Sequence, residues 1–278
     1  MKRFDAKGRT LDLSVPRVMG ILNVTPDSFS DGGKFLGADS ALQQAKKMIA
    51  EGAYFIDVGG ESTRPGAAEV SLQQELDRVI PVIEILSREF DIALSVDTSK
   101  AGVMRAAVDA GAVLINDVRA LREAGALEAA VASGAYACLM HMQGEPRTMQ
   151  ESPQYADVLD EVVSFLRQRV AACVTAGMDC SRLLVDPGFG FGKSLQHNLL
   201  LLKHIEDFKV LGLPVLVGVS RKSMFGQLLG LDVAERLTPS VAAAVMAVMQ
   251  GAKVVRAHDV KETAQALALC AAVLSQAS

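Results

Sequence analysis

Short apolar runs rich in Val, Ile and Leu recur eight times along the chain. They cover residues 18–24, 54–59, 93–97, 113–117, 136–140, 183–186, 215–219 and 254–257. The runs lack the polar alternation of a strand with one solvated face. They therefore predict strands that are buried on both faces.

The segments between these runs repeat apolar residues at helical spacing. The clearest are residues 40–51, 72–89, 158–176 and 241–250. Several end in glycine, such as Gly52 and Gly251, which favours a left-handed helix C-cap. Alternating strands and helices predict a parallel sheet.

Eight strand–helix units in about 250 residues favour a closed barrel. The expected fold is therefore α/β, a single (β/α)8 TIM barrel formed by one domain over residues 1–278. The alternative is an open doubly wound sheet with a small helical domain. No GxGxxG motif follows the first run, which argues against a dinucleotide-binding sheet.

Composition narrows the classes of partner and location. The net charge is −4 and no basic run occurs, so nucleic acid is not an expected partner. The N-terminus lacks the pattern of a signal peptide, and no apolar run approaches the roughly 18 residues of a membrane span. The four cysteines form no CxxC pair and predict core thiols in a reducing compartment. We therefore expect a cytoplasmic protein.

Polar residues stand at or just beyond the end of every predicted strand. In a (β/α)8 barrel these carboxyl ends meet at one rim, where the active site forms. One such residue alone has a local explanation, such as Asp117 capping a helix, but the whole set predicts a binding site. It comprises Asn23, Asp57, Asp97, Asn116, Asp117, His141, Asp186, Arg221, Lys222, Arg256 and His258.

The basic members of this set come from the seventh and eighth strands, where such barrels often bind phosphate. Asn23, on the first strand, closes the ring beside them. Arg221, Lys222, Arg256 and His258 thus predict an anion pocket in an acidic chain.

Opposite this pocket we expect Asp97, Asn116 and Asp186. Carboxylates and amides suit the edge of a flat heterocycle, and Asp186 has the geometry to accept two parallel N–H bonds. Phe191, in a glycine-rich run, either covers an aromatic ligand or packs locally. The polar loops after the first and second strands are expected to cover the site or to be ordinary surface loops.

Six segments of the chain resemble the bacterial dihydropteroate synthases, a pterin-binding TIM-barrel family. The segments are residues 19–33, 57–66, 95–98, 186–191, 220–223 and 256–260. The resemblance spans nearly the whole chain. It implies a transferase of folate biosynthesis that condenses 6-hydroxymethyl-7,8-dihydropterin pyrophosphate with 4-aminobenzoate and releases pyrophosphate. It also implies a homodimer and competition by sulfonamides for the 4-aminobenzoate pocket.

The resemblance also implies roles for individual residues. The pterin would be held by Asp97, Asn116, Asp186, Lys222, Phe191 and Met140. The pyrophosphate would be held by Asn23, Arg256 and His258, with Asn23 also binding Mg²⁺. The 4-aminobenzoate pocket would contain Phe29, Thr63, Arg64, Pro65 and Ser223. The catalytic set would be Asn23, Asp97, Lys222, Arg256 and His258.

Two alternatives remain at the level of sequence. A pterin-binding methyltransferase domain acting with a corrinoid partner shares the barrel and the Asp/Asn site, but it needs no pyrophosphate pocket. A non-catalytic pterin-binding module would not need Asn23, Arg64 and Lys222, all of which are present. No Ser-His-Asp or Cys-His arrangement is evident. An SN1-like loss of pyrophosphate requires none.

Overall fold

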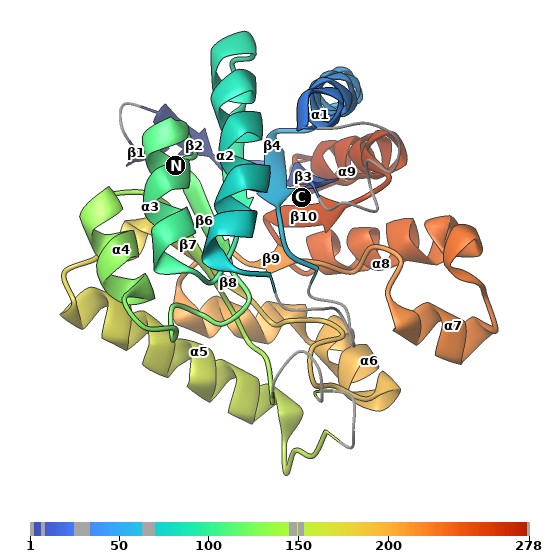
Figure 1. Cartoon of the computed structure of the whole chain (residues 1–278). Coiled ribbons are helices and arrows are strands. Elements are labelled where there is room, and N and C mark those ends of the chain that lie inside the picture. Colours follow the sequence, from blue (N-terminus) through green and yellow to red (C-terminus); the bar gives the residue numbers. More distant parts are fainter. Residues whose placement is uncertain are drawn as a thin grey trace.

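The computed structural model describes residues 3–6, 9–24, 34–62, 70–144, 149 and 153–276. Eight parallel strands lie side by side in the order β8-β7-β6-β5-β4-β3-β10-β9 (Figure 1). A parallel bridge between Val185 and Val215 joins the two edges of this sheet, which closes it into a barrel. The predicted (β/α)8 fold is therefore confirmed, and the open doubly wound alternative is wrong. The barrel strands are β3 (Arg17–Asn23), β4 (Phe55–Gly59), β5 (Ala93–Asp97), β6 (Leu114–Asp117), β7 (Tyr136–Met140), β8 (Leu183–Asp186), β9 (Leu216–Val217) and β10 (Val254–Ala257).

Seven of these strands match the predicted runs to within one residue at each end. The exception is β9, which has two residues where the run at 215–219 predicts five. The Val215 carbonyl still accepts a hydrogen bond from the Lys253 N–H at 2.8 Å. Beyond Val217 the chain leaves the ladder and turns at Arg221, whose φ is +54°. The turn shortens the strand and directs the next residues to the rim.

Helices surround the barrel on its outer side (Figure 1). The predicted helices correspond to α1, α2, α5 and α8. Helix α8 begins earlier than predicted because Pro239 lies in its first turn, where proline costs no hydrogen bond. The helices are α1 (Lys34–Ala50), α2 (Leu72–Glu89), α3 (Ala101–Ala110), α4 (Ala126–Ser133), α5 (Val158–Thr175), α6 (Leu195–Lys203), α7 (Ser223–Leu229), α8 (Leu237–Met249) and α9 (Val260–Leu274).

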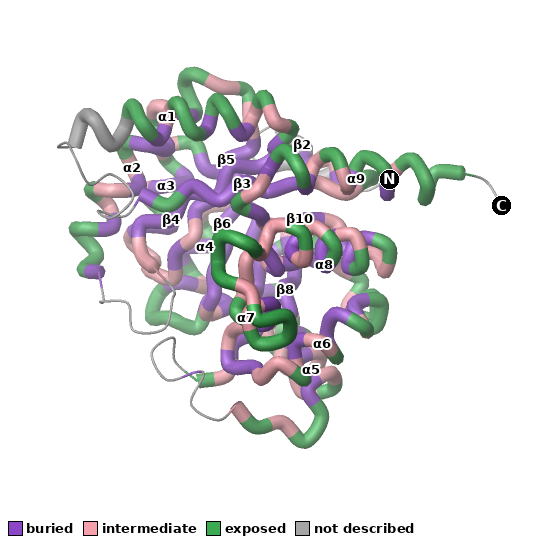
Figure 2. Tube along the Cα trace, turned by 90° about the vertical axis from the view of Figure 1, so that its right-hand side faces the viewer, coloured by how far each residue is buried: buried purple, intermediate pink, exposed green. Residues whose placement is uncertain are grey.

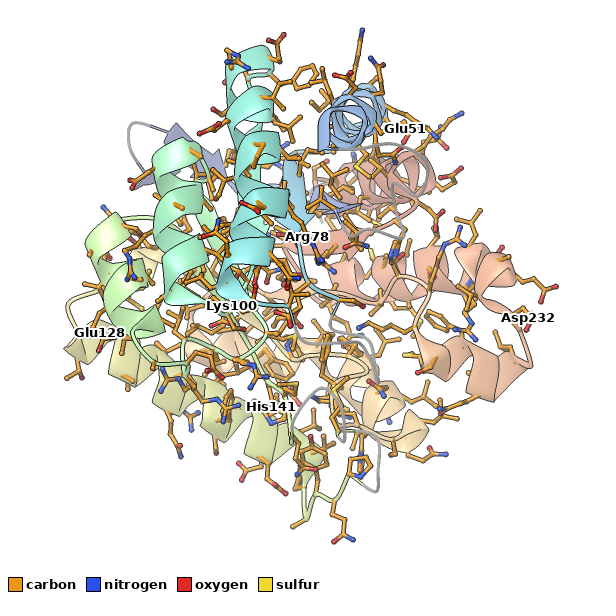
Figure 3. All side chains as sticks on the ribbon, in the orientation of Figure 1. Glu51, Arg78, Lys100, Glu128, His141 and Asp232 are labelled. Atoms are coloured by element: carbon orange, nitrogen blue, oxygen red, sulfur yellow. The ribbon has the colours of Figure 1, made fainter. Side chains whose placement is uncertain are left out.

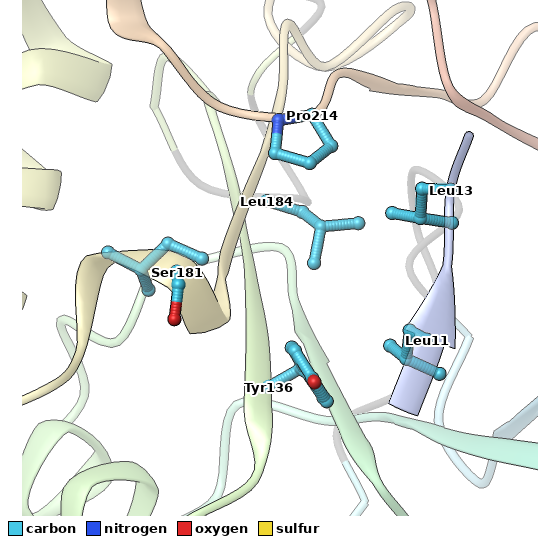
Figure 4. Close-up of a pocket in the computed structure, with 7 residues that line it drawn as sticks. Leu11, Leu13, Tyr136, Ser181, Leu184 and Pro214 are labelled. Carbon is cyan, nitrogen blue, oxygen red and sulfur yellow. The ribbon is translucent and has the colours of Figure 1, made fainter. Parts of the chain in front are cut away.

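A hairpin that the sequence pattern did not predict covers the N-terminal end of the barrel. Strands β1 (Arg3–Ala6) and β2 (Arg9–Asp12) pair antiparallel. Leu11 and Leu13 then pack on Tyr136 and the other apolar side chains at that end. Figure 4 shows the small pocket at this contact, which no charged residue lines. This end of the barrel is therefore closed by apolar packing.

The barrel strands are buried along most of their length (Figure 2), and their two faces belong to separate apolar clusters. The outer face packs against the helices through residues such as Ile56, Val96 and Leu139. The inner face fills the N-terminal half of the barrel. Its members include Met19, Phe55, Leu114, Tyr136, Leu184, Leu216 and Val254. No helix in the described part of the chain is long and apolar enough to cross a membrane.

Candidate functional site

The inner face of the barrel changes from apolar to polar between one inward-pointing residue of a strand and the next. Side chains alternate between the two faces of a strand, so every second residue points inward. Two residues beyond the inner apolar cluster stand Asp57 on β4, Asn116 on β6, Asp186 on β8 and Arg256 on β10. Four strands thus deliver polar groups to the same level.

The guanidinium of Arg256 crosses the barrel and bridges two carboxylates. Its Nε donates to Oδ2 of Asp57 at 2.6 Å, and its Nη2 donates to Oδ2 of Asp97 at 2.8 Å. Burial opposes the charge, but the carboxylates of Asp57 and Asp97 raise the pKa of Arg256. Placing Arg256 and Asp97 on opposite sides was therefore wrong. The long arginine side chain brings the basic and acidic groups into one network.

Asp57 belongs to the predicted strand-end set, although no individual role was predicted for it, and it is the centre of this network. It is fully buried, and its Oδ2 also accepts from Nδ2 of Asn116 at 3.0 Å. Its Oδ1 is buried without a hydrogen-bond partner among the described residues. The signal available in the sequence was a carboxylate inside an apolar strand, which requires a cationic partner.

Asp97 and Asp186 are carboxyl groups whose protonation changes near neutral pH. Burial raises the pKa of Asp97 to about 7, against the opposing charge of Arg256. Burial likewise raises the pKa of Asp186 to about 6, opposed by a 2.7 Å hydrogen bond from the Gly188 N–H and by the charge of Lys222. Shifts of this kind are typical of functional sites.

Lys222 and Phe191 meet beside Asp186. The Lys222 Nζ lies 4.3 Å from the centre of the Phe191 ring, a cation–π contact. Burial lowers the pKa of Lys222 to about 8, opposed by the charge of Asp186. Phe191 also packs on the apolar cluster that contains Met140, the register partner of Asp186. The expected pterin residues on β7 and β8, in the loop after β8 and in the loop after β9 therefore lie together.

The end of β10 carries an exposed histidine that a neighbouring hydroxyl holds. Ser220 Oγ lies 3.0 Å from Nδ1 of His258 and accepts a hydrogen bond from the His258 backbone N–H at 3.1 Å. Arg221 does not join it in an anion pocket, which corrects the sequence analysis. Its guanidinium forms a paired contact with Asp259 at 2.7 and 2.9 Å. This contact holds the turn at Arg221.

Asn23 ends β3 with an exposed side chain. It faces Asp97 across Gly59, where an added Cβ would lie 3.7 Å from the Asn23 Oδ1 and 3.4 Å from the Asp97 Cβ. Ser223 is exposed at the first position of α7, next to Lys222. The other expected 4-aminobenzoate residues lie outside the described residues: Phe29, Thr63, Arg64 and Pro65.

An ion-paired cluster at the start of the second loop was missed from sequence. Lys100, labelled in Figure 3, contacts Glu61, and it also donates to Oε2 of Glu75 at 2.6 Å. Oε1 of Glu61 accepts from the Val70 N–H at 3.3 Å, so one carboxylate ties two points nine residues apart. Glu75 lies on the buried stripe of α2, and a charge on that stripe was the available signal.

Asp117 serves the local structure rather than the rim. Its carboxylate accepts hydrogen bonds from the backbone N–H groups of Arg119 at 2.8 Å and Leu121 at 2.7 Å. The helix-cap explanation weighed for this residue is close to what the structure shows. Asp117 stabilises the turn after β6.

The donor set determines which metal could bind. Within the described residues no group of three or more His, Cys, Asp or Glu side chains could hold a metal ion. A site built wholly from such ligands is therefore not found there. The Asn23 amide oxygen at the rim instead suits Mg²⁺, which takes few protein ligands and completes its shell with water and phosphate oxygens.

Comparison with known proteins gives one family. A family model described as pterin binding enzyme matches residues 19–258. The chain is 56% identical over 275 residues to the dihydropteroate synthase of Escherichia coli (strain K12), covering 99% of this chain and 97% of that protein.

Solved structures give the same result. The Yersinia pestis dihydropteroate synthase in a sulfonamide drug complex has a TM-score of 0.94 and 56% identity, covering 99% of this chain and all of that one. The Xanthomonas albilineans dihydropteroate synthase with 4-aminobenzoic acid has a TM-score of 0.93 and 50% identity, covering 99% of both chains.

Proposed function

The chain belongs to the dihydropteroate synthases of the pterin-binding enzyme family, and from that premise we propose that the polar end of its barrel binds and activates the pterin pyrophosphate. The enzyme is a transferase that condenses 6-hydroxymethyl-7,8-dihydropterin pyrophosphate with 4-aminobenzoate. The methyltransferase alternative is not favoured, because the full-length relatives are synthases.

The observation that carries the site proposal is the buried network in which Arg256 joins Asp57, Asp97 and, through Asp57, Asn116. Buried charges on four strands at one level are costly unless they are paired and used. The proposed pterin residues are Asp97, Asn116, Asp186 and Lys222, with Met140 and Phe191 as apolar contacts. Asp186, when ionised, accepts from the aminopyrimidinone edge of the pterin.

The pyrophosphate is proposed to bind Arg256, His258 and Asn23. The contacts with Asp57 and Asp97 use two of the five guanidinium N–H donors of Arg256, so others remain for phosphate oxygens. Asn23 fits as a ligand of Mg²⁺, which when bound would neutralise charge on the leaving pyrophosphate. Arg256 and His258 stabilise the same developing charge by electrostatics alone.

The methylene carbon attached to the pterin ring loses pyrophosphate first. The amine then adds to the resulting cation and gives up one N–H proton to the released pyrophosphate or to water. The electron-rich pterin ring delocalises the positive charge, so no protein nucleophile is needed. Lys222 and Phe191 hold the ring in place, and exclusion of water protects the cation. The aryl amine is neutral near pH 7, so the reaction requires little base catalysis.

The amine pocket is proposed to contain Ser223 with Phe29, Thr63, Arg64 and Pro65. Ser223 supports this placement because it directly follows Lys222 at the rim. The related structures described with 4-aminobenzoic acid and with a sulfonamide drug support the same ligand class. Sulfonamides are proposed to compete with 4-aminobenzoate here.

A homodimer is proposed to form through the faces of α6 to α9. In the described part of the chain, all but three of the exposed large hydrophobic side chains (Val15, Leu72 and Val174) lie between Leu200 and Leu274. Helices α6, α7, α8 and α9 are neighbours (Figure 2). Exposed apolar surface gathered on one side favours an interface.

A cytoplasmic location is proposed because none of the four cysteines is in a disulfide.

A coupled assay tests the proposed function. Purified protein is mixed with the dihydropterin pyrophosphate, 4-aminobenzoate and Mg²⁺, and both pyrophosphate and dihydropteroate are measured. We expect equal amounts of the two products. Pyrophosphate alone would mean that the amine pocket is misassigned. Neither product, with pterin binding retained, would contradict the proposed activity.

A further inference from the structure

The loop between β8 and α6 contains a buried lysine that the reaction described above does not use. Lys193 is 2% exposed. Its Nζ lies 2.9 Å from the Gly188 carbonyl, 3.0 Å from the Phe191 carbonyl and 3.3 Å from the His141 carbonyl. It also lies 2.9 Å from Nδ1 of His141. Four acceptors from two loops therefore surround one ammonium group, whose three N–H donors they share.

The loop packs closely on the chain that follows β7. Of these carbonyls, only that of Gly188 has a second donor among the described residues, the Phe191 N–H at 3.1 Å. At Gly188, with φ +72°, an added Cβ would lie 1.9 Å from the His141 carbonyl oxygen. At Gly192, with φ +61°, it would lie 2.3 Å from the Gln143 carbonyl oxygen. Backbone packed at this distance leaves little room for water, and Lys193 is the donor that reaches the His141 and Phe191 carbonyls.

We propose that Lys193 is a positioning residue for the pterin site, an internal donor that holds the 188–191 turn so that Phe191 lies over Lys222 beside Asp186. This inference rests on the proposed pterin site. The Phe191 carbonyl that Lys193 binds belongs to the same residue whose ring lies 4.3 Å from the Lys222 Nζ. Movement of the turn would displace both groups.

The charge of Lys193 acts on the same site. It helps to lower the pKa of Asp186, which burial otherwise raises. Burial lowers the pKa of Lys193 itself to about 7, with Asp186 opposing and Lys222 reinforcing the shift. Burial, together with the charge of Lys193, lowers the pKa of His141 to about 2, so this imidazole is neutral and accepts through Nδ1. Arg122 is the further charged group that faces His141.

Lys193→Met tests the proposal through binding of the bare pterin, without pyrophosphate, measured by calorimetry. We expect Kd to rise about ten-fold or more, as for loss of a buried charge-assisted hydrogen bond. The KM for 4-aminobenzoate should stay within about two-fold, because Ser223, the described member of the proposed amine pocket, is not among the groups that Lys193 contacts. Lys193→Arg keeps the charge and should recover part of the affinity.

The pH dependence of pterin binding separates positioning from stability. In Lys193→Met the acid limb set by Asp186 should move to higher pH, because a neighbouring positive charge is lost. In Lys193→Arg it should stay in place. Loss of affinity without this shift, in proportion to a lower melting temperature, would overturn the electrostatic half of the proposal.

Two control variants separate this effect from general loosening. Tyr155→Phe removes a 2.7 Å hydrogen bond to the Gly192 carbonyl in the same loop without changing charge, and should alter Kd by less than about three-fold. Leu86→Ala destabilises the protein by removing a fully buried side chain of α2 and should leave pterin affinity unchanged. Equal losses in Lys193→Met and Leu86→Ala at matched stability would overturn the proposal.

A spectroscopic measurement keeps the proposal testable if Lys193→Met does not fold. The ¹⁵N spectrum of the wild-type protein should show Nδ1 of His141 unprotonated through neutral pH. A proton on Nδ1 would exclude donation from Lys193 and overturn the proposal. Asp186→Asn separates an error in the proposed pterin site from an error in the role of Lys193. If it binds pterin normally, the proposed pterin site is wrong; if it loses binding while Lys193→Met does not, only the role of Lys193 is wrong.

Discussion

The two halves of the barrel interior differ in chemistry although the same strands build both. On β4, Phe55 fills the N-terminal half and Asp57 the C-terminal half; on β10, Val254 and Arg256 do the same. Two residues, about 7 Å along a strand, separate packing from charge. A change in the N-terminal half should therefore mainly affect stability, and a change in the C-terminal half should mainly affect function.

The N-terminal half is expected to carry stability because it is apolar and closely packed. The C-terminal half contains groups whose burial is unfavourable on its own, such as Asp97, whose pKa is raised to about 7. Their pairing limits the cost but does not remove it. Functional sites commonly depart in this way from the rules that stabilise a core.

The largest effect is expected at Lys222 in the C-terminal half. Lys222→Ala should reduce turnover by roughly 1,000-fold, since a charge beside the reacting pterin is lost. The melting temperature should change little. The coupled assay and a thermal melt measure the two effects, with exposed Lys209→Ala as the control. Near-normal turnover would remove Lys222 from the site.

The reverse result is expected at Phe55 in the N-terminal half. Phe55→Ala should lower the free energy of unfolding by about 3–5 kcal/mol, because Phe55 is fully buried. At temperatures where the variant stays folded, kcat/KM should remain within about two-fold. Urea unfolding and steady-state kinetics measure these quantities. Loss of activity in the folded variant would show that the halves are not independent.

Arg256→Ala sharpens the comparison within the C-terminal half. Affinity for the pterin pyrophosphate should fall about 100-fold and affinity for the bare pterin about 10-fold, since only the former loses a phosphate contact. Calorimetry with the two ligands measures the difference, and exposed Arg88→Ala serves as the control. Equal losses would move the anion site elsewhere.

The titrating groups of the C-terminal half give binding a pH optimum. Asp186 must be ionised, so affinity for the bare pterin should fall as pH drops below about 6. Lys193 and Lys222 must both be protonated, so affinity should begin to fall as pH rises through about 7 and should fall further above about 8. Each limb should approach a ten-fold loss per pH unit. In Asp186→Asn a limb that remains near pH 6 would assign that limb to another group.

The smallest effect is expected at Ser95, on the border between the halves. Its hydroxyl is fully buried and has no hydrogen-bond partner among the described residues. Ser95→Ala should therefore change the free energy of unfolding by less than about 0.5 kcal/mol or increase it. A loss above 1 kcal/mol, on the order of one hydrogen bond, would mean that Ser95 has a bound water or ligand as its partner.

The barrel could be predicted from sequence because its strands are uniformly apolar runs, and seven of the eight were placed to within one residue. The rim residues followed from their position at strand ends. The links between them could not be predicted. That Arg256 reaches Asp57, 199 positions earlier in the chain, depends on barrel closure rather than on local pattern.

The hairpin and Lys193 were missed for different reasons. The strands of the hairpin are four residues each, too short and too polar to show a period. Lys193 follows a glycine-rich run and resembles an exposed loop residue, yet it is buried because two glycines let the backbone approach β7. Such burial depends on tertiary contacts rather than on residue type.

The β1–β2 hairpin closes the N-terminal end of the barrel. Leu11 and Leu13 pack against the inner apolar cluster there. The C-terminal end of the barrel is therefore the end through which ligands of the proposed site would pass. That end would then serve both substrates, the pterin pyrophosphate and the amine, and both products. In the proposed site the joined product and pyrophosphate would therefore leave through the same end of the barrel by which the two substrates enter.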